Sequence, residues 1–217
     1  MLAVVVADGD PAPEDAEVVG HADLLVAADG GARWTERLGV TPHLVVGDLD
    51  SLDEAALSRL SLAGARVERH PIDKDASDTE LAVEAALKSG ADRVVVLGAF
   101  GGNRLDHELA NVLLLADPAI GAGVRLQRGS TSVRAISGPG TLQLETGVGA
   151  TVTLLPVGVG AEGVTTRGLR YALEGEPLMV GRSRGLSNVI TDEPASVSLL
   201  SGTLLVIEIG NVKEGES

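Results

Sequence analysis

The chain has 217 residues, of which 44% are hydrophobic, so it can bury a core as one large domain or as two modest ones. Its 17 basic and 31 acidic side chains give a formal charge of -14, which argues against nucleic acid and anionic membrane surfaces as partners because both repel it at long range. The absence of cysteine rules out disulfides, thiolate zinc sites and a cysteine nucleophile, and it fits a cytoplasmic protein.

The first half of the chain alternates short apolar runs with segments of helical character. The opening run has no basic region before it and stops at Asp8, so we expect a first strand and not a leader or a membrane span. The expected strands are Leu2–Ala7, Leu24–Ala28, Leu44–Val46, Arg66–Arg69 and Arg93–Leu97. Helices are expected after Gly30, Asp53, Ser77 and Arg104, the last of them over 106–117. This alternation predicts an α/β domain with a mostly parallel, Rossmann-like sheet, helices on both faces, and ligands beyond the carboxyl ends of the strands.

The second half changes to short segments of period near two, separated by Gly, Pro, Ser and Thr. These segments are Val124–Gln127, Thr141–Glu145, Thr151–Leu155, Val197–Leu200 and Leu204–Ile209. They predict a small antiparallel β-sandwich or partial barrel. We place the boundary near Arg128, which gives domains of 1–128 and 129–217, and we expect the tail Lys213–Ser217 to be frayed.

Acidic clusters follow the expected strands of the first half. Asp48 and Asp50 flank one residue, and in extended geometry both side chains would point the same way and share a metal ion. A solvated turn explains them equally well. Asp75 and Asp78 can complete a Mg²⁺ site beside Lys74, a compact cation for phosphate, although a capped helix start also explains Asp78.

Two glycine pairs end strands in the same half. Gly30 and Gly31 follow Asp29, and Gly101 and Gly102 lead into a segment with Arg104, Asp106 and His107. Both pairs permit backbone contact with a ligand, but neither matches the dinucleotide or Walker fingerprints. Arginine suits phosphate because of its planar fork, whereas we expect His107 to be a surface or packing residue.

The second half offers two further candidate segments. Composition alone explains Val164–Tyr171 and Gly185–Asn188 as a hairpin with polar turns. In the functional interpretation, the Tyr171 ring stacks on a flat heterocycle, and Ser187 and Asn188 supply hydrogen bonds.

Together and in this order, these segments resemble the thiamine pyrophosphokinase family, also called thiamine diphosphokinases, over nearly the whole chain. The resemblance rests on the segments 28–32, 47–51, 74–80 and 101–107, and on 164–171 with 187–188. It implies an N-terminal α/β nucleotide-binding domain followed by a β-sandwich. It also implies transfer of an intact diphosphate from ATP to the thiamine hydroxyl, with release of AMP, a requirement for Mg²⁺, and a homodimer.

The resemblance also assigns roles to individual residues. Asp48, Asp50, Asp75 and Asp78 would hold the metal and the diphosphate, and Asp29 would lie near the reacting phosphates. Lys74 and Arg104 would neutralise phosphate charge, while Asp106 and the glycines at 30, 31, 101 and 102 would border the nucleotide. Thr166, Tyr171, Ser187 and Asn188 would border thiamine. Three features depart from the pattern: Asn103 separates Gly102 from Arg104, Tyr171 stands where some members have tryptophan, and no lysine lies beside Asp29.

Two other functions stay open from the sequence. One is a diphosphokinase for another heterocyclic alcohol, such as a pterin, on the same nucleotide half. The other is a non-catalytic nucleotide-binding relative. The retained carboxylates argue against the second, because crowded acidic groups are costly unless a cation offsets them.

Overall fold

The computed structural model describes residues 1–211 as two compact units. The first unit is Met1–Leu114 with Gly123–Gly129, and the second is Leu115–Ala122 with the chain from Ser130 onward. The tail Lys213–Ser217, which we expected to be frayed, lies outside the described residues. Within residues 1–211, no helix is both long and apolar enough to cross a membrane.

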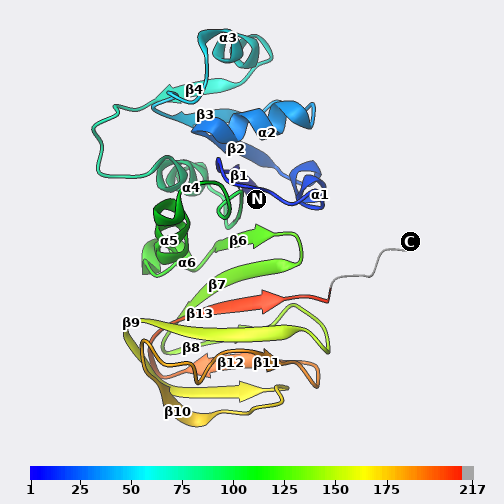
Figure 1. Cartoon of the computed structure of the whole chain (residues 1–217), viewed down its shortest axis with the longest axis vertical. Helices are drawn as coiled ribbons and strands as arrows, with labels where there is room; N and C mark the ends of the chain where they lie inside the picture. The colour runs from blue at the N-terminus through cyan, green and yellow to red at the C-terminus, as the bar shows by residue number, and fades with distance from the viewer. Residues whose placement is uncertain (212–217) are drawn as a thin grey trace. The chain divides into compact units, whose positions relative to one another are not determined.

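The first unit contains a parallel sheet with the strand order β4-β3-β2-β1-β5-β6 (Figure 1). Its strands are β1 (Leu2–Val6), β2 (Leu24–Ala28), β3 (Leu44–Gly47), β4 (Arg66–Arg69), β5 (Arg93–Leu97) and β6 (Val124–Arg128). All neighbouring pairs run parallel. The predicted parallel sheet is therefore confirmed. The segment Val124–Gln127, which we grouped with the short strands of the second half, instead adds to the edge of this sheet through β5.

The order of these strands decides where a ligand can bind. From β1 the chain builds the sheet in one direction to β4, and it then returns to place β5 on the other side of β1. Open parallel sheets leave a crevice outside the carboxyl ends of the strands at such a reversal. The residues of β1 from Ala3 to Val6 are fully buried, so the reversal lies at the centre of the core.

Helices connect the strands of the first unit, and one short helix belongs to the second unit. They are α1 (Asp15–Gly20), the 3₁₀ helix η1 (Asp29–Gly31), α2 (Ala32–Arg37), α3 (Glu54–Leu62), α4 (Asp78–Lys88), α5 (Leu105–Leu114) and α6 (Pro118–Gly121). The four expected helices are confirmed. Asp53 and Ser77 cap α3 and α4 by accepting from the N–H groups of Ala56 (2.6 Å) and Glu80 (3.1 Å).

Two helical details differ from the prediction. Helix α1 was not predicted, and the last expected helix ends at Leu114 instead of residue 117. The early end follows from Pro118, because a residue before proline disfavours helical backbone. Asp117 is extended and caps α6 by accepting from the N–H of Ala119 at 2.8 Å.

The second unit is built from antiparallel strands, with the order β7-β13-β9-β12-β8 and with β10 and β11 also paired to β9 (Figure 1). The strands are β7 (Thr131–Ser137), β8 (Gly140–Gln143), β9 (Thr151–Arg167), β10 (Glu174–Leu178), β11 (Asn188–Val189), β12 (Ser196–Leu199) and β13 (Ser201–Ile209). The predicted antiparallel pairing is confirmed, although β7, β10 and the two-residue β11 were not predicted. Strand β9 is far longer than expected and changes partners along its length.

A buried charge anchors the second unit. Glu208 on β13 is only 1% exposed, and its carboxylate pairs with Arg134 on β7. It also accepts from the N–H groups of Glu145 (2.7 Å) and Thr146 (2.9 Å) and from the Thr146 hydroxyl (2.9 Å). Burial alone would raise the pKa of Glu208, but the Thr146 N–H, the Arg134 guanidinium and the Glu145 N–H hold this pKa below its ordinary value of 4.5.

We expect Glu208→Gln to lower the free energy of unfolding at neutral pH by about 1–3 kcal/mol, because Arg134 loses its buried counter-charge and keeps only the half-exposed Glu145, which lies 2.6 Å from its Nη1. A lowered pKa stabilises the fold above the pKa of the unfolded chain, and this stabilisation is lost as the pH falls through the folded pKa. Urea unfolding across the acid range measures both effects. The exposed Glu174 on β10 provides a matched Glu174→Gln control, and equal losses in the two variants would contradict the assignment.

Candidate active site

A cavity of about 560 Å³ opens in the first unit beyond the carboxyl ends of the parallel strands. Its wall is formed by the segments that follow β1, β2, β3 and β5 and by the first turns of α4 and α5. The polar side chains on the wall come from Asp8, Asp29, Asp48, Asp50, Ser51, Ser77, Asp78, Thr79, Asn103, Arg104, His107, Glu108 and Asn111. The cavity is therefore strongly acidic and carries few cationic groups of its own.

Three carboxylates meet at the base of this arrangement. Asp29 follows β2, Asp48 follows β3, and Asp78 is the first residue of α4. One oxygen from each lies within 4.8 Å of the others. The Ser77 cap fixes where α4 begins, so it also fixes where Asp78 lies. Charged oxygens at this separation repel one another, so the group needs positive charge nearby.

Gly47, the last residue of β3, makes the close approach possible. A Cβ atom at this position would lie 2.9 Å from Asp78 Oδ1 and 3.1 Å from the Asp29 Cβ, which is too close for an ordinary contact. Its φ of 150° also lies in the region that favours glycine. Any larger residue would push the carboxylates apart.

Lys74 supplies positive charge to two members of the group. Its Nζ lies 3.0 Å from Asp48 Oδ2 and 3.0 Å from Asp78 Oδ1, and it is only 14% exposed. Burial disfavours the charged ammonium, but the contacts with the Asp78 and Asp48 carboxylates raise the pKa of Lys74 above its ordinary value. The bond from Lys74 in turn lowers the pKa of Asp48. Lys74 therefore acts as an internal counter-ion in this structure.

Asp29 has no such partner. Its side chain is buried, which raises the pKa of Asp29, and its Oδ1 is a buried atom without a hydrogen bond. Asp78 Oδ1 lies within ion-pair distance of Lys74 but also lacks a well-directed hydrogen bond. Divalent cations such as Mg²⁺ prefer carboxylate oxygens of this kind. The residues present thus fit a divalent cation held by Asp29, Asp48 and Asp78.

Two residues of the expected metal set lie outside this group of three. Leu49 has a φ of 65°, so Asp48 and Asp50 are not in the extended geometry that we expected, although both lie on the cavity wall. Instead, Asp50 donates its N–H to Asp48 Oδ1 at 3.2 Å, and its own side chain lies on the cavity wall outside the group of three. Asp75 is exposed and lies neither in the group nor on the wall.

The two glycine pairs have different surroundings. Gly101 and Gly102 line the cavity, and the N–H of Gly102 donates to Asp10 Oδ2 at 3.2 Å. A Cβ on Gly101 would lie 2.6 Å from that carboxylate. Gly30 and Gly31 are buried and are not on the wall. They pack so tightly that a Cβ on Gly30 would clash with the Asp8 carboxylate and a Cβ on Gly31 with the Val6 carbonyl. Gly30 and Gly31 therefore have a packing role, whereas Gly101 and Gly102 have access to a ligand.

Arg104 lies on the wall but is already paired. Its Nε and Nη2 donate to the Asp106 carboxylate at 2.9 and 2.6 Å, and both side chains are exposed. This bidentate contact lowers the pKa of Asp106 to about 2. Asp106 itself is not on the wall. Its carboxylate holds the Arg104 guanidinium, and a bound anion would have to compete with Asp106 for this group.

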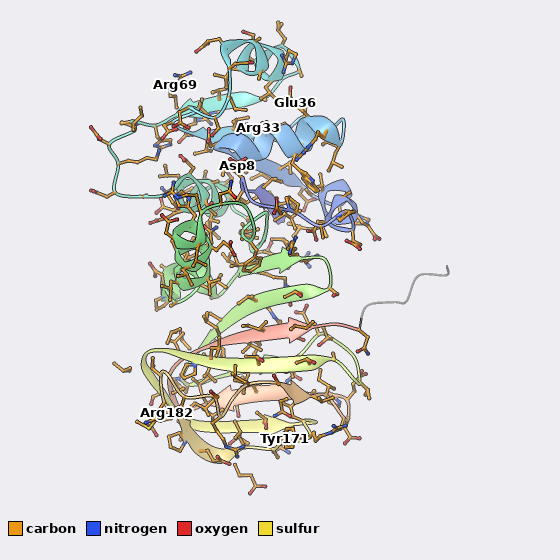
Figure 2. All side chains as sticks on the ribbon, in the orientation of Figure 1. Asp8, Arg33, Glu36, Arg69, Tyr171 and Arg182 are labelled. Atoms are coloured by element: carbon orange, nitrogen blue, oxygen red, sulfur yellow. The ribbon has the colours of Figure 1, made fainter. Side chains whose placement is uncertain are left out.

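Several wall residues were not predicted. Asp8 follows β1, and its Oδ2 lies 3.6 Å from Arg33 Nη2. Figure 2 labels both residues. Asn111 is buried and donates to the carbonyl of Ala99 at 3.0 Å, which ties α5 to the loop after β5. Asp8 follows directly after an apolar run, and this position could have predicted a site residue from the sequence. Asn111 lies within a helix, where no local pattern marks it as a site residue.

The predicted residues of the second unit divide into two kinds. Thr166 and Asn188 are buried, and their polar atoms bond to neighbouring main chain. Tyr171 is 56% exposed, and Ser187 is exposed with a φ of 55° (Figure 2 labels Tyr171). Only the latter pair is therefore free to contact a ligand directly.

Comparisons with known proteins agree across both units. Two family models match the chain: "Thiamin pyrophosphokinase, catalytic domain" over residues 16–123 and "Thiamin pyrophosphokinase, vitamin B1 binding domain" over residues 141–204. A thiamine pyrophosphokinase of Bacillus subtilis is 24% identical over 95% of this chain and 98% of its own length. A crystal structure of the B. subtilis enzyme has a TM-score of 0.84 at 24% identity and covers 98% of this chain and all of that chain. A thiamin pyrophosphokinase family protein of Enterococcus faecalis has a TM-score of 0.80 at 27% identity, with the same coverage.

We expect Gly47→Ala to weaken the binding of a divalent cation by about tenfold or more, because the added Cβ separates the carboxylates that hold it. Titration calorimetry with Mg²⁺ and with Mn²⁺ measures this affinity. Gly39→Ala is the matched control, since Gly39 also has a positive φ (70°) but has no atom near its would-be Cβ. Equal affinity in Gly47→Ala and the wild type would contradict the site.

Proposed function

We propose that this chain, which belongs to the thiamine pyrophosphokinase family, transfers the diphosphate of ATP to the hydroxyl of thiamine and releases thiamine diphosphate and AMP. The match of both family domains, in order, along one chain carries this conclusion. The group of Asp29, Asp48 and Asp78 in a cavity at the switch point of the sheet supports it independently.

Magnesium is the cation that this chemistry calls for, and we propose that Asp29, Asp48 and Asp78 hold it, with Asp50 nearby on the wall. When bound, the ion would neutralise phosphate charge and align the diphosphate. This assignment differs from the expected set of Asp48, Asp50, Asp75 and Asp78, since it adds Asp29 and leaves out Asp50 and Asp75.

The chain's own residues can position the nucleotide. Gly101 and Gly102 leave room for a phosphate beside the backbone, and Arg104 stands on the same wall. The first turn of α4 offers backbone N–H groups to an anion, and Lys74 lies next to it. For Lys74 and Arg104 to reach phosphate, each must exchange a carboxylate partner for a phosphate oxygen.

In the transfer step, the thiamine hydroxyl oxygen bonds to the β-phosphorus while the bond from that phosphorus to the α–β bridging oxygen breaks. The electron pair of the broken bond leaves with AMP, and the hydroxyl proton passes to a wall carboxylate or to water. Placement dominates such reactions, since orientation alone can supply about 7–11 kcal/mol of barrier reduction. We leave open which of Asp48, Asp50 and Asp78 orients the hydroxyl.

We propose that thiamine is bound by the second unit through the Tyr171 ring and the Ser187 hydroxyl, both of which are exposed within the matched vitamin B1 binding domain. The further expectations, that this unit is a β-sandwich, that the protein is a homodimer and that it is cytoplasmic, remain proposals that rest on the family resemblance and the composition.

The decisive experiment supplies the purified protein with Mg²⁺, one nucleoside triphosphate at a time, and thiamine, a pterin alcohol or no acceptor. AMP-type product and diphosphorylated acceptor are quantified together. We expect equal amounts of AMP and thiamine diphosphate from ATP and thiamine. Product only with the pterin, or binding of ATP without any transfer, would reject the proposed function in favour of a different acceptor or a non-catalytic relative.

We expect Asp78→Asn to reduce kcat by on the order of 100-fold or more, because Asp78 belongs to the carboxylate group that would stabilise charge in the transition state. The same substitution at Asp75, which lies off the cavity wall, should have a far smaller effect. Asp73→Asn, in the same exposed segment, controls for the loss of one charge. Comparable losses in Asp75→Asn and Asp78→Asn would show that the apparent group of three is not the functional one.

A further inference from the structure

A single buried amide holds both main-chain groups of Tyr171. Asn188 is 7% exposed, and its Oδ1 accepts from the N–H of Tyr171 at 3.0 Å, while its Nδ2 donates to the carbonyl of Tyr171 at 2.8 Å. The same Oδ1 also accepts from the N–H of Val189 at 2.9 Å. These bonds use most of what an amide side chain can offer, so little remains for a ligand.

The segment that carries Tyr171 joins β9 to β10 and is held at several other points. The hydroxyl of Thr166 accepts from the N–H of Leu173 at 2.9 Å, and the N–H of Thr191 donates to the carbonyl of Gly168 at 2.8 Å. The side chains of Leu169 and Leu173 are buried. Between these anchors Tyr171 is exposed together with Arg170 and Ala172, and it carries the one aromatic ring of this segment, so the anchoring presents the ring instead of burying it.

The residue before Asn188 is the other exposed candidate for ligand contact. Ser187 has a φ of 55°, which is uncommon outside glycine, and its N–H donates to the Thr153 hydroxyl at 3.1 Å. Strained residues of this kind persist where the surrounding structure holds them, often at functional sites. Asn188 is bonded covalently to Ser187 and by hydrogen bonds to Tyr171, so it fixes the spacing between the two.

We infer that Asn188 is a positioning residue that acts through Tyr171: it sets the Tyr171 ring and the Ser187 hydroxyl at the spacing that a flat heterocycle requires, and it does not itself contact thiamine. This inference rests on the proposed function. It also differs from the expectation that Asn188 borders thiamine, since the polar atoms of Asn188 are committed to the protein. A ring that is already held in place loses less conformational freedom when it stacks on a ligand. Loss of the Asn188 hydrogen bonds should therefore weaken the binding of thiamine.

The test compares steady-state kinetics of the wild type, Asn188→Asp, Tyr171→Ala and the double variant. Asn188→Asp keeps the acceptor for the Tyr171 N–H but loses the donor to its carbonyl. We expect it to raise the KM for thiamine by about tenfold, with the KM for ATP changed by less than about twofold. In the Tyr171→Ala background, the same change should add no further increase, because the ring that it positions is gone.

Thr146→Val serves as the matched control, since it removes a hydroxyl bond to Glu208 in the same unit, away from Tyr171. It should lower the Tm without moving the KM for thiamine. An independent readout uses the wild type alone: Tyr171 is the only tyrosine in the chain, so its ring resonances in the NMR spectrum should shift when thiamine is added.

Three results would overturn the inference. One is an unchanged KM for thiamine in Asn188→Asp with a lowered Tm, which marks a purely structural role. Another is an equal increase in KM with and without the Tyr171 ring, which marks direct contact by Asn188. The third is a Tyr171 resonance that thiamine does not move. Failure of the wild type to make thiamine diphosphate would instead reject the proposed function, so the two failures are distinguishable.

Discussion

The mutual repulsion of three carboxylates is the constraint around which the first unit is organised. Asp29, Asp48 and Asp78 come from different elements, yet their oxygens lie within 4.8 Å of one another. That arrangement is unfavourable unless the backbone allows it and a cation offsets it. Gly47 provides the space, and Lys74 provides the charge for two of the three. A divalent ion would complete the compensation at Asp29, whose Oδ1 is otherwise unpartnered.

Backbone strain marks the same places as the polar chemistry. In residues 1–211, positive φ outside glycine is found at Asp29, Leu49 and Ser187. The first two lie in or beside the carboxylate group, and the third lies next to the Asn188 anchor. Such conformations are costly and persist when neighbouring contacts determine them. Their coincidence with the proposed nucleotide and thiamine contacts therefore supports both assignments from a property of the backbone alone.

Buried polar side chains, and not aromatic packing, hold the loops of this protein in place. With one Phe, one Trp and one Tyr in the chain, the core is aliphatic, and aliphatic side chains alone specify loop positions weakly. Asp15 is fully buried and accepts from the N–H groups of Ala12 (2.8 Å) and Gly129 (2.9 Å), with burial raising the pKa of Asp15. Asn188 and Glu208 play the same part in the second unit. Satisfied networks of this kind hold a chain in one arrangement.

The sequence by itself determined the parallel sheet and the positions of the caps, because both depend on local patterns: continuous apolar runs, and Asp53 and Ser77 before helical segments. It also indicated which acidic residues matter, since the carboxyl ends of parallel strands meet at one edge. Only the tertiary structure decided which of them converge. The left-handed backbone at Leu49 breaks the extended geometry between Asp48 and Asp50, and Asp29 completes the group of three in place of Asp50 and the exposed Asp75. Likewise, whether Asn188 faces a ligand or the backbone of Tyr171 depends on a contact across 17 residues, which no local pattern encodes.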